Sequence, residues 1–515
     1  MKLDAFTSTF PKLPGAMPIW HGAINAQELC SLGEQVKKAG GKLVALWGSD
    51  ETEKDSSYAL HVALLCADGM LVLTLPVDQT KPAFPDMSVL FPAANRMQRS
   101  VADMLGLHST EGGDHRKWLR HAAWPGDVHP LRKSFNMNSR FPPKDDNYPF
   151  VTVTGKGVHE IAVGPVHAGI IEPGHFRFSV VGERVLKLEE HLGYKHKGIE
   201  KRFENMNLQQ GAKLAGRISG DTTVGYAWAY AQAVESVTLT TPPLRALWLR
   251  ALFLELERLL NHLGDLGYLG NDAALTFGFS QFWILKEDLL RMNGELFGHR
   301  YLMDRILPGG VACDIDKSGL LRIAETLNHI KHETIILKEI YDEHAGMQDR
   351  FLTTGHVAPD LAAQLGLTGL AGRASGQAWD ARAQFPCVPY DQLDVNMVTH
   401  RNGDVAARVT MRFEEIFESI RLILVMIEKL PASELLTVIG SAKEGTLGIG
   451  WVEGWRGEIM IALHVGENNR IHRLHPHDPS WQNWPVLEHA IMDNIVPDFP
   501  LINKSFNLSY SGVDL

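Results

Sequence analysis

One stretch near the middle of the chain constrains the fold more than any other. Residues 216–222 are a run of small polar residues, and residues 223–235 follow with alanine and aromatic side chains. A helix that is apolar on most of its circumference is usually buried. Ser219, Asp221 or Thr222 can each accept a hydrogen bond from the free N–H groups of its first turn. The stretch therefore predicts a capped helix packed inside the protein.

The size and charge of the chain limit what it can be. Its 515 residues are enough for two or three domains with substantial cores. A net charge of −10, with no basic tract, argues against a nucleic-acid binder. The first residues lack the apolar core of a signal peptide. No apolar run reaches the roughly 18–20 residues of a membrane span, so we expect a chain that is not itself transmembrane.

The cysteines exclude several kinds of metal and redox site. Cys30, Cys66, Cys313 and Cys387 lie far apart, and no CxxC pair is present. Zinc, iron–sulfur and thioredoxin-like sites therefore lose their usual sequence support. Scattered thiols in a large chain are typical of a reducing compartment.

The first part of the chain has the pattern of a small unit of helices and strands. We expect a helix over 26–38, strands over 42–47, 58–66 and 70–76, and a second helix over about 93–105. Ala67-Asp68-Gly69 separates the last two strands and predicts a hairpin. On the second helix, Arg96, Arg99 and Asp103 are expected to face water or a partner.

A linker separates this unit from the rest of the chain. Residues 140–149 are rich in proline and charge and have no periodicity. We therefore divide the chain into a unit over 1–140, a linker over 141–154 and a larger unit over 155–515. In the larger unit we expect strands over 155–162 and 176–188, long helices over 242–263 and 280–302, turns at 270–276 and 305–311, and a hairpin beginning at Gly454.

The first unit resembles a known family. The stretches that carry the resemblance are 91–99, 103–107 and 124–133. They look like the small peripheral-arm subunit of respiratory complex I. The resemblance implies a docking domain without a cofactor, in which Arg99, Asp103 and Arg132 are structural or interface charges.

The larger unit resembles the large subunit of membrane-bound nickel–iron hydrogenases and the related quinone-site subunit of complex I. The matching stretches are 164–176, 191–201, 305–311, 366–376 and 403–408. The resemblance implies an α+β protein: a small α/β docking domain, then a mostly α-helical domain with a small β-sheet at its start. Fusion of the two units in one chain resembles the hydrogenase branch.

The positions that would hold nickel carry other residues. In the hydrogenases the turn at 217–222 reads Arg-Ile-Cys-Gly-x-Cys, and its thiolates bind the metal; here Ser219 and Thr222 match those cysteines. The second CxxC falls in residues 498–512, where no cysteine occurs. The run Asn503-Lys504-Ser505-Phe506-Asn507 is compatible with a polar lining of the cavity. An alcohol is a poor ligand for a metal that favours thiolates. We therefore expect no bound metal.

The resemblance assigns the remaining candidate residues. Glu172 matches a hydrogenase glutamate linked to proton transfer, and His167 or His175 lies where complex I places a histidine near the quinone head. Arg456 matches an arginine above the hydrogenase metal, where a guanidinium can bind an anion. The structural alternatives are histidines that are bonded to the backbone or solvated, and a buried ion pair for Arg456.

Two further groups of residues are ambiguous. The complex I tyrosine that bonds quinone matches Gly220, so Asp221 or Tyr226 would have to substitute for it. The three histidines at 472, 475 and 477 look like metal ligands. Proline interrupts them, and the family has a structural turn there, so we expect a structural role.

Together these features predict a catalytic-module subunit of a membrane-bound, energy-converting respiratory complex that lacks the nickel–iron centre. It would couple redox or conformational change to ion translocation by partner subunits. The alternative is a quinone-reducing subunit that takes electrons from a partner's iron–sulfur cluster, with His175, Asp221 or Tyr226 at the quinone head.

The resemblance also implies the surroundings of the subunit. Its partners would be a small iron–sulfur subunit and membrane-embedded antiporter-like and complex I-like subunits. We expect no cofactor of its own, although the cavity could serve quinone, and a peripheral position on the cytoplasmic face of the plasma membrane. NAD would enter only through other subunits, because no glycine-rich dinucleotide fingerprint is present.

Overall fold

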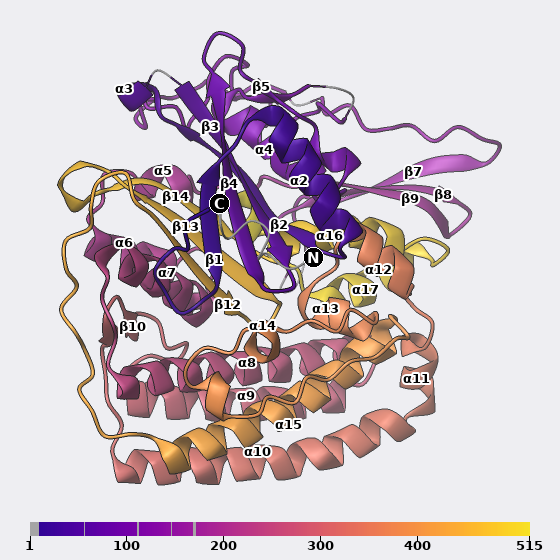
Figure 1. Cartoon of the computed structure of the whole chain (residues 1–515). Coiled ribbons are helices and arrows are strands. Elements are labelled where there is room, and N and C mark those ends of the chain that lie inside the picture. Colours follow the sequence, from indigo (N-terminus) through magenta and orange to yellow (C-terminus); the bar gives the residue numbers. More distant parts are fainter. Residues whose placement is uncertain (1–9, 56, 111–112, 146, 168–170) are drawn as a thin grey trace.

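A computed structural model describes residues 10–55, 57–110, 113–145, 147–167 and 171–515. Figure 1 shows the N-terminal sheet above a second sheet, with helix α7 below it and long helices forming the lowest layer. This arrangement of helices and strands confirms the predicted α+β class. Within the described residues, no helix is both long and apolar enough to cross a bilayer.

The N-terminal unit is a four-stranded sheet in the order β1-β4-β3-β2, in which only β1 and β4 run parallel. The strands are β1 (Ile19–Ala23), β2 (Lys42–Asp50), β3 (Ser57–Cys66) and β4 (Gly69–Asp78). Around them lie α2 (Ala26–Lys38), α3 (Thr52–Asp55), β5 (Ala83–Phe84), η1 (Met87–Val89), α4 (Ala94–Leu105) and β6 (His108–Ser109). The predicted helix over 26–38 and the hairpin of β3 and β4 are confirmed.

Both faces of this sheet are covered. Leu60, Val62 and Leu64 of β3 share one cluster with the apolar residues of α2 and α4. Ala63 of β3 and Val72 of β4 lie in a second cluster with residues of the sheet below. Because successive side chains of a strand point to opposite faces, the sheet is packed on both sides.

The prediction that Arg96, Arg99 and Asp103 face water or a partner is wrong. All three are at most 7% exposed. Arg96 forms ion pairs of 2.8 Å with Glu190 and with Glu488 from the larger unit. Asp103 accepts backbone N–H groups from the segment after β6. These charged residues of α4 therefore bind other segments of the chain. They are buried because of partners that lie far from them in the sequence.

The larger unit starts with a three-stranded antiparallel sheet of β7 (Val158–Val163), β8 (His175–Val181) and β9 (Arg184–His191). The single strand predicted over 176–188 is wrong. Gly182 has a φ of +60° and reverses the chain there, a conformation that glycine adopts readily. The expected strand is thus the two arms of a hairpin.

Helices make up most of the remainder. They are α5 (Ile199–Phe203), α6 (Leu208–Ala215), α7 (Thr223–Thr238), α8 (Leu244–Asp272), α9 (Thr276–Phe297), α10 (Lys317–Glu343), α11 (Ala345–Phe351), α12 (Pro359–Leu365), α13 (Gly369–Ala374), α14 (Ala381–Gln384), η2 (Tyr390–Gln392), α15 (Val405–Lys429), α16 (Ser480–Ala490), η4 (Val496–Asp498), α17 (Phe499–Phe506) and α18 (Ser511–Asp514). Helix α8 extends to Asp272, and the turn predicted over 270–276 is present at residues 273–275, before α9. The turn predicted at 305–311 is the short hairpin of β10 (Ile306–Leu307) and β11 (Gly310–Val311).

A second three-stranded sheet lies at the centre, formed by β12 (Leu447–Glu453), β13 (Glu458–Val465) and β14 (Ile471–His477), with η3 (Glu467–Asn469) before the last strand. Residues 454–457 are the turn of a hairpin that starts at Leu447, not its beginning as predicted. Helix α7 lies directly on β12: a Cβ atom at Gly450 would come within 1.7 Å of the Ala229 carbonyl oxygen. Glycine therefore lets helix and strand backbones touch.

Buried histidines join the two sheets. His61 of β3 and His464 of β13 have ring centroids 4.8 Å apart. Trp47 stacks between His61 and His475, at 5.1 and 5.2 Å. Burial lowers the pKa of His61 well below its ordinary value and that of His464 to about 3. Both rings are therefore neutral in the folded protein at neutral pH.

Stability should fall as the pH drops below about 6.5, the ordinary histidine value. Each depressed pKa means that the unfolded chain binds the proton first. The contribution of each neutral histidine to the free energy of unfolding is therefore complete above about pH 6.5. It is lost toward pH 3, at up to about 1.4 kcal/mol per pH unit for each histidine. The midpoint of urea unfolding, measured across this range, checks the slope. His464→Gln should reduce the slope of the midpoint against pH. His332→Gln, at an exposed position of α10, should leave that slope unchanged.

Candidate functional site

A polar pocket of about 90 Å³ lies where several distant segments meet. It is lined by Ile171, Glu172, Asp221, Arg456, Asn503, Lys504, Asn507, Leu508 and Tyr510. Asp221 comes from the turn before α7 and Arg456 from the turn between β12 and β13. Glu172 precedes β8, and the last residues belong to α17 and the segment after it. The structure thus brings together three of the predicted residues, Glu172, Asp221 and Arg456.

Asp221 and Arg456 form a two-pronged ion pair. Arg456 Nη2 donates to Asp221 Oδ2 at 2.6 Å, and Nη1 donates to Oδ1 at 3.0 Å. Burial disfavours the charge on Asp221, but the Arg456 guanidinium outweighs it and holds the pKa of Asp221 well below its ordinary range. The Arg456 side chain is 6% exposed and that of Asp221 39%. The carboxylate therefore faces the pocket while the arginine is set into the wall.

The two hydroxyls at the cysteine positions serve this ion pair. Ser219 Oγ and Thr222 Oγ1 donate to Asp221 Oδ1 at 2.7 and 3.0 Å. Thr222 Oγ1 also accepts from Arg456 Nη1 at 3.0 Å and from the Trp455 indole at 3.2 Å. Hydroxyls that are already hydrogen-bonded do not suit a nickel ion, which thiolates and imidazoles would bind better. The residues here do not fit that metal.

Glu172 lies across the pocket from this pair. Its carboxylate accepts from the backbone N–H and the hydroxyl of Ser511, at 3.2 and 2.8 Å. Lys195 Nζ lies 3.5 Å away. The pocket therefore contains two acids, Glu172 and Asp221, and two bases, Arg456 and Lys504, together with amide and phenol groups.

The two predicted histidines do not line this pocket as the structure describes it. His167 Nε2 donates to the carbonyl of Gly174 at 2.7 Å, which matches the alternative of a backbone-bonded histidine. His175 begins β8 and packs against Phe150, with ring centroids 5.1 Å apart. Burial lowers the pKa of His175. Residues 168–170 of this loop lie outside the described residues.

Tyr226 and Ser505 also point elsewhere. Tyr226 is fully buried, and its hydroxyl donates to Asp478 Oδ2 at 2.7 Å. Burial and that carboxylate raise the pKa of Tyr226 well above its ordinary value. Ser505 accepts from Arg408 Nε at 2.8 Å and donates to the carbonyl of Ile502 at 2.6 Å. Both residues hold packing together behind the site.

The prediction that Ser219, Asp221 or Thr222 accepts the free N–H groups at the start of α7 is wrong. Thr222 is the N-cap residue, but its side chain accepts no N–H group of the first turn. The carboxylate of Glu257, on α8, accepts instead from Val224 N at 2.6 Å and from the next N–H at 3.1 Å. Burial raises the pKa of Glu257 to about 8. No local sequence pattern marks this contact, because Glu257 is one of several charged residues along α8.

Asn503, Lys504 and Asn507 of the polar run predicted over 503–507 line the pocket, whereas Ser505 does not. Asn507 Oδ1 accepts from Arg456 Nη2 at 3.4 Å, and its amide donates to Asp265 at 2.6 Å. Lys504 pairs with Asp272 at 2.7 Å. Lysine and asparagine stand beside Ser505 in the sequence, but only the helical turn decides which of them faces the pocket.

The three histidines at 472, 475 and 477 lie on β14 and not in a turn. They are bonded, respectively, to Glu51 (3.1 Å), Glu200 (2.8 Å) and Gln482 (3.1 Å). Over the part of the chain that the structure covers, no group of three or more histidine, cysteine or acidic residues is arranged to hold a metal ion.

Two family models match the sequence. The model of the respiratory-chain NADH dehydrogenase 30 Kd subunit matches residues 7–141, and that of the 49 Kd subunit matches residues 272–446. Formate hydrogenlyase subunit 5 of Escherichia coli K12 is 30% identical over 485 residues, which are 93% of this chain and 85% of that protein. Hydrogenase-4 component G of the same organism is 31% identical over 92% of this chain and 84% of its own length.

A fused relative and a solved structure are similar as well. The C/D subunit of the NADH-quinone oxidoreductase of Phocaeicola vulgatus is 27% identical over 84% of this chain and 87% of its own. In the membrane-bound sulfane sulfur reductase, an archaeal respiratory membrane complex, one chain superposes with a TM-score of 0.66 at 24% identity. The match covers 71% of this chain and all of that one, and it reports on the fold alone.

Proposed function

Because this chain belongs to the family of fused 30 Kd- and 49 Kd-type subunits of complex I-like and hydrogenase-related membrane complexes, we propose that it is the catalytic-module subunit of an energy-converting respiratory complex without a nickel–iron centre. The family assignment confirms the resemblance inferred for both units. The absence of the metal centre is the part that the proposal adds.

The Asp221–Arg456 ion pair is the observation that supports this proposal. Asp221 and the two hydroxyls that support it, of Ser219 and Thr222, lie in the turn where the hydrogenases carry thiolates, and Arg456 reaches that turn from the β12–β13 hairpin. A guanidinium held at 2.6 Å by a carboxylate already has its counter-charge. The Asp221 carboxylate is thus committed to Arg456, and the two hydroxyls are poor ligands for a metal that favours thiolates. The pocket is thus built around an internal charge pair.

We infer that the pocket couples a change in one part of the complex to ion translocation by partner subunits. Its two acids and two bases balance one another, so a charged ligand or a change in a neighbouring redox centre would alter the pairing. The alternative, quinone reduction by this chain, loses support because His175 and Tyr226 are directed away from the pocket. Asp221 is the one residue of that alternative that lines it.

The partners follow from the same family. The relatives are named as components of formate hydrogenlyase, hydrogenase-4 and NADH-quinone oxidoreductase, and the superposed chain comes from a respiratory membrane complex. By analogy, we propose a small iron–sulfur subunit and membrane-embedded antiporter-like subunits as partners of this chain. We further propose that it lies peripherally on the cytoplasmic face. Purification of the chain as a monomer that needs no partners would count against this assignment.

Metal analysis of the purified complex tests the central claim. We expect nickel at well below one atom per chain, because the site offers hydrogen-bonded hydroxyls in place of thiolates. Mass-spectrometric metal quantification is the measurement, with Asp221→Asn as a second sample and Asp493→Asn, an exposed position, as its control. Nickel at one atom per chain, lost in Asp221→Asn and kept in Asp493→Asn, would overturn the proposal.

A further inference from the structure

A second cavity lies between the two units of the chain, away from the pocket described above. Helix α4 contributes Met97, Ser100 and Met104 to its wall, and β14 contributes His475 and His477. The space has a volume of about 20 Å³. A cavity needs roughly 10–15 Å³ to admit one water molecule. It is therefore large enough for one such molecule and too small for an organic ligand.

Each histidine uses one ring nitrogen and leaves the other free. His475 Nδ1 lies 2.8 Å from a carboxylate oxygen of Glu200, and His477 Nε2 lies 3.1 Å from the side-chain oxygen of Gln482. Those oxygens only accept, because the Gln482 amide group donates to backbone carbonyls. The hydrogen of each neutral ring must therefore sit on the bonded nitrogen. The other nitrogen presents a bare lone pair.

Those two lone pairs are buried. His475 is 6% exposed and His477 1%, and within the described residues neither His475 Nε2 nor His477 Nδ1 has a hydrogen-bond partner. Burial lowers the pKa of both rings, that of His477 to about 3. The unbonded nitrogens are therefore not protonated at neutral pH and stay acceptors. A buried acceptor without a donor is costly. The site therefore calls for a small neutral molecule with two hydrogens to donate.

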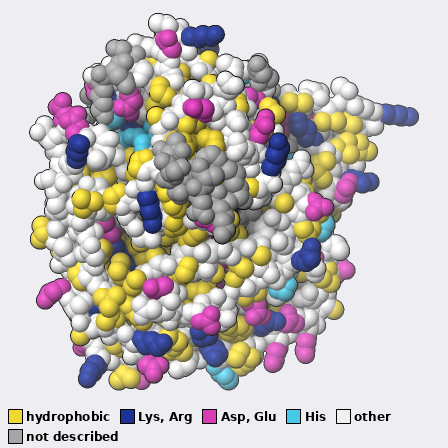
Figure 2. Space-filling view, in the orientation of Figure 1, with side chains coloured by type: hydrophobic (Ala, Val, Ile, Leu, Met, Phe, Trp, Pro, Cys, Tyr) yellow, Lys and Arg dark blue, Asp and Glu magenta, His cyan; other side chains and the backbone are white. Residues whose placement is uncertain are grey.

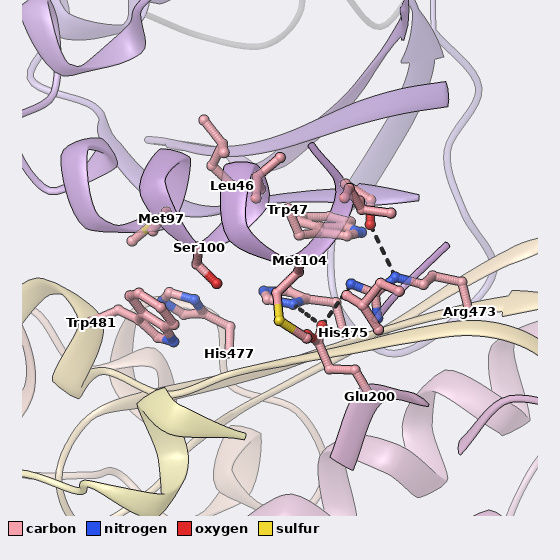
Figure 3. A pocket seen from close by; sticks show the side chains of 14 residues that line it. Leu46, Trp47, Met97, Ser100, Met104, Glu200, Arg473, His475, His477 and Trp481 are labelled. Atoms are coloured by element: carbon pink, nitrogen blue, oxygen red, sulfur yellow. Dashed lines mark hydrogen bonds and ion pairs between the residues drawn. The ribbon is translucent and has the colours of Figure 1, made fainter. Parts of the chain in front are cut away.

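Figure 3 shows the Ser100 hydroxyl and the rings of His475 and His477 turned toward the same space. We propose that one buried water molecule binds there, donates to His475 Nε2 and His477 Nδ1, and accepts the hydroxyl hydrogen of Ser100. Three hydrogen bonds are typical of a buried structural water. The water would connect α4 of the N-terminal unit to β14 of the larger unit.

A bridging water gives the histidines of β14 a definite role. His475 stacks on Trp47 of the N-terminal sheet and is bonded to Glu200, which also pairs with Arg473 at 2.6 Å. The water extends this chain of contacts to His477 and Ser100. Sequence reasoning considered these histidines as metal ligands; their tautomers make them acceptors for water.

A high-resolution map of the purified complex tests the proposal. We expect one peak within hydrogen-bonding distance of Ser100 Oγ, His475 Nε2 and His477 Nδ1. Ser100→Val places methyl groups in the space and should remove the peak. Ser31→Val makes the same change at an exposed position of helix α2 and should retain it. A space with no density in the unaltered protein would overturn the proposal, as would a peak identified as a metal by its anomalous scattering.

A solution measurement covers the case in which Ser100→Val does not fold. Oxygen-17 magnetic relaxation dispersion counts long-lived buried waters in the intact protein. His477→Phe keeps an aromatic ring but removes the lone pair, so we expect one long-lived water fewer than in the unaltered chain. An unchanged count in a folded His477→Phe protein would overturn the proposal. If neither variant folds, the map of the unaltered complex decides.

Discussion

Glu255→Leu is expected to lower the free energy of unfolding by about 3–5 kcal/mol. Glu255 is fully buried on α8 and accepts from Arg382 at 3.0 and 3.1 Å, from Arg258 at 3.2 Å, and from Tyr390 and Ser419 at 2.7 Å each. Burial disfavours its charge, but Arg382 and Arg258 hold its pKa below the ordinary value. Leucine would leave two buried guanidinium groups short of negative charge.

The comparison with an exposed acid makes this measurement specific. Urea unfolding followed by tryptophan fluorescence gives the midpoint for each variant. Glu287→Leu makes the same substitution on α9, where Glu287 pairs with Arg291 and Arg300 at the surface, and it should leave the midpoint close to that of the unaltered chain. Equal midpoints for the two variants would show that the buried ion network does not stabilise the fold.

Arg456→Met is expected to raise the pKa of Asp221 from well below its ordinary range to that range or above it. Burial pushes the pKa of Asp221 upward, and Arg456 is the main group that opposes this. Methionine keeps the length of the side chain and removes the charge. Infrared titration of the carboxylate band follows the change, and the band is assigned by its loss in the Arg456→Met, Asp221→Asn double variant.

Arg456→Lys separates charge from geometry. Lysine restores a positive charge but cannot reproduce the two parallel bonds of a guanidinium. We expect its Asp221 pKa to lie between those of the unaltered chain and Arg456→Met. An Asp221 pKa that stays low in Arg456→Met would mean that the hydroxyls of Ser219 and Thr222, at 2.7 and 3.0 Å, suffice to stabilise the carboxylate.

The features predicted correctly from the sequence are those with local causes. Helix α2 starts at Asn25, whose side chain and Glu28 form a reciprocal cap, and it ends before Gly40. The hairpin of β3 and β4 turns at the Ala67–Gly69 segment that predicted it. Such signals act within a few residues, so the sequence contains all that is needed to interpret them.

The failures have causes that are remote in sequence. Arg96 looked like a surface charge because its partners, Glu190 and Glu488, lie in the larger unit. The cap of α7 comes from Glu257, more than thirty residues after the helix start. No local pattern marks either contact. Both required the assembled tertiary structure.

The candidate site shows the same division. Resemblance to a family located Glu172, Asp221 and Arg456, which do line one pocket. It did not give the directions of Tyr226 and Ser505, since a side chain's direction depends on the turn of helix that carries it. Of the polar run over 503–507, Lys504 and Asn507 face the pocket and Ser505 does not. The family supplied positions, and only the fold supplied orientations.

The two faces of β12 have a mechanical consequence. Its Leu447, Ile449 and Trp451 side chains pack in the cluster that contains the N-terminal sheet, while Gly448 and Gly450 lie against the backbone of α7. At these two glycines the strand has no side chain of its own between its backbone and the helix, so the contact is close-packed. A rigid-body shift of the N-terminal unit would thus be transmitted through strand and helix to the turn that carries Asp221.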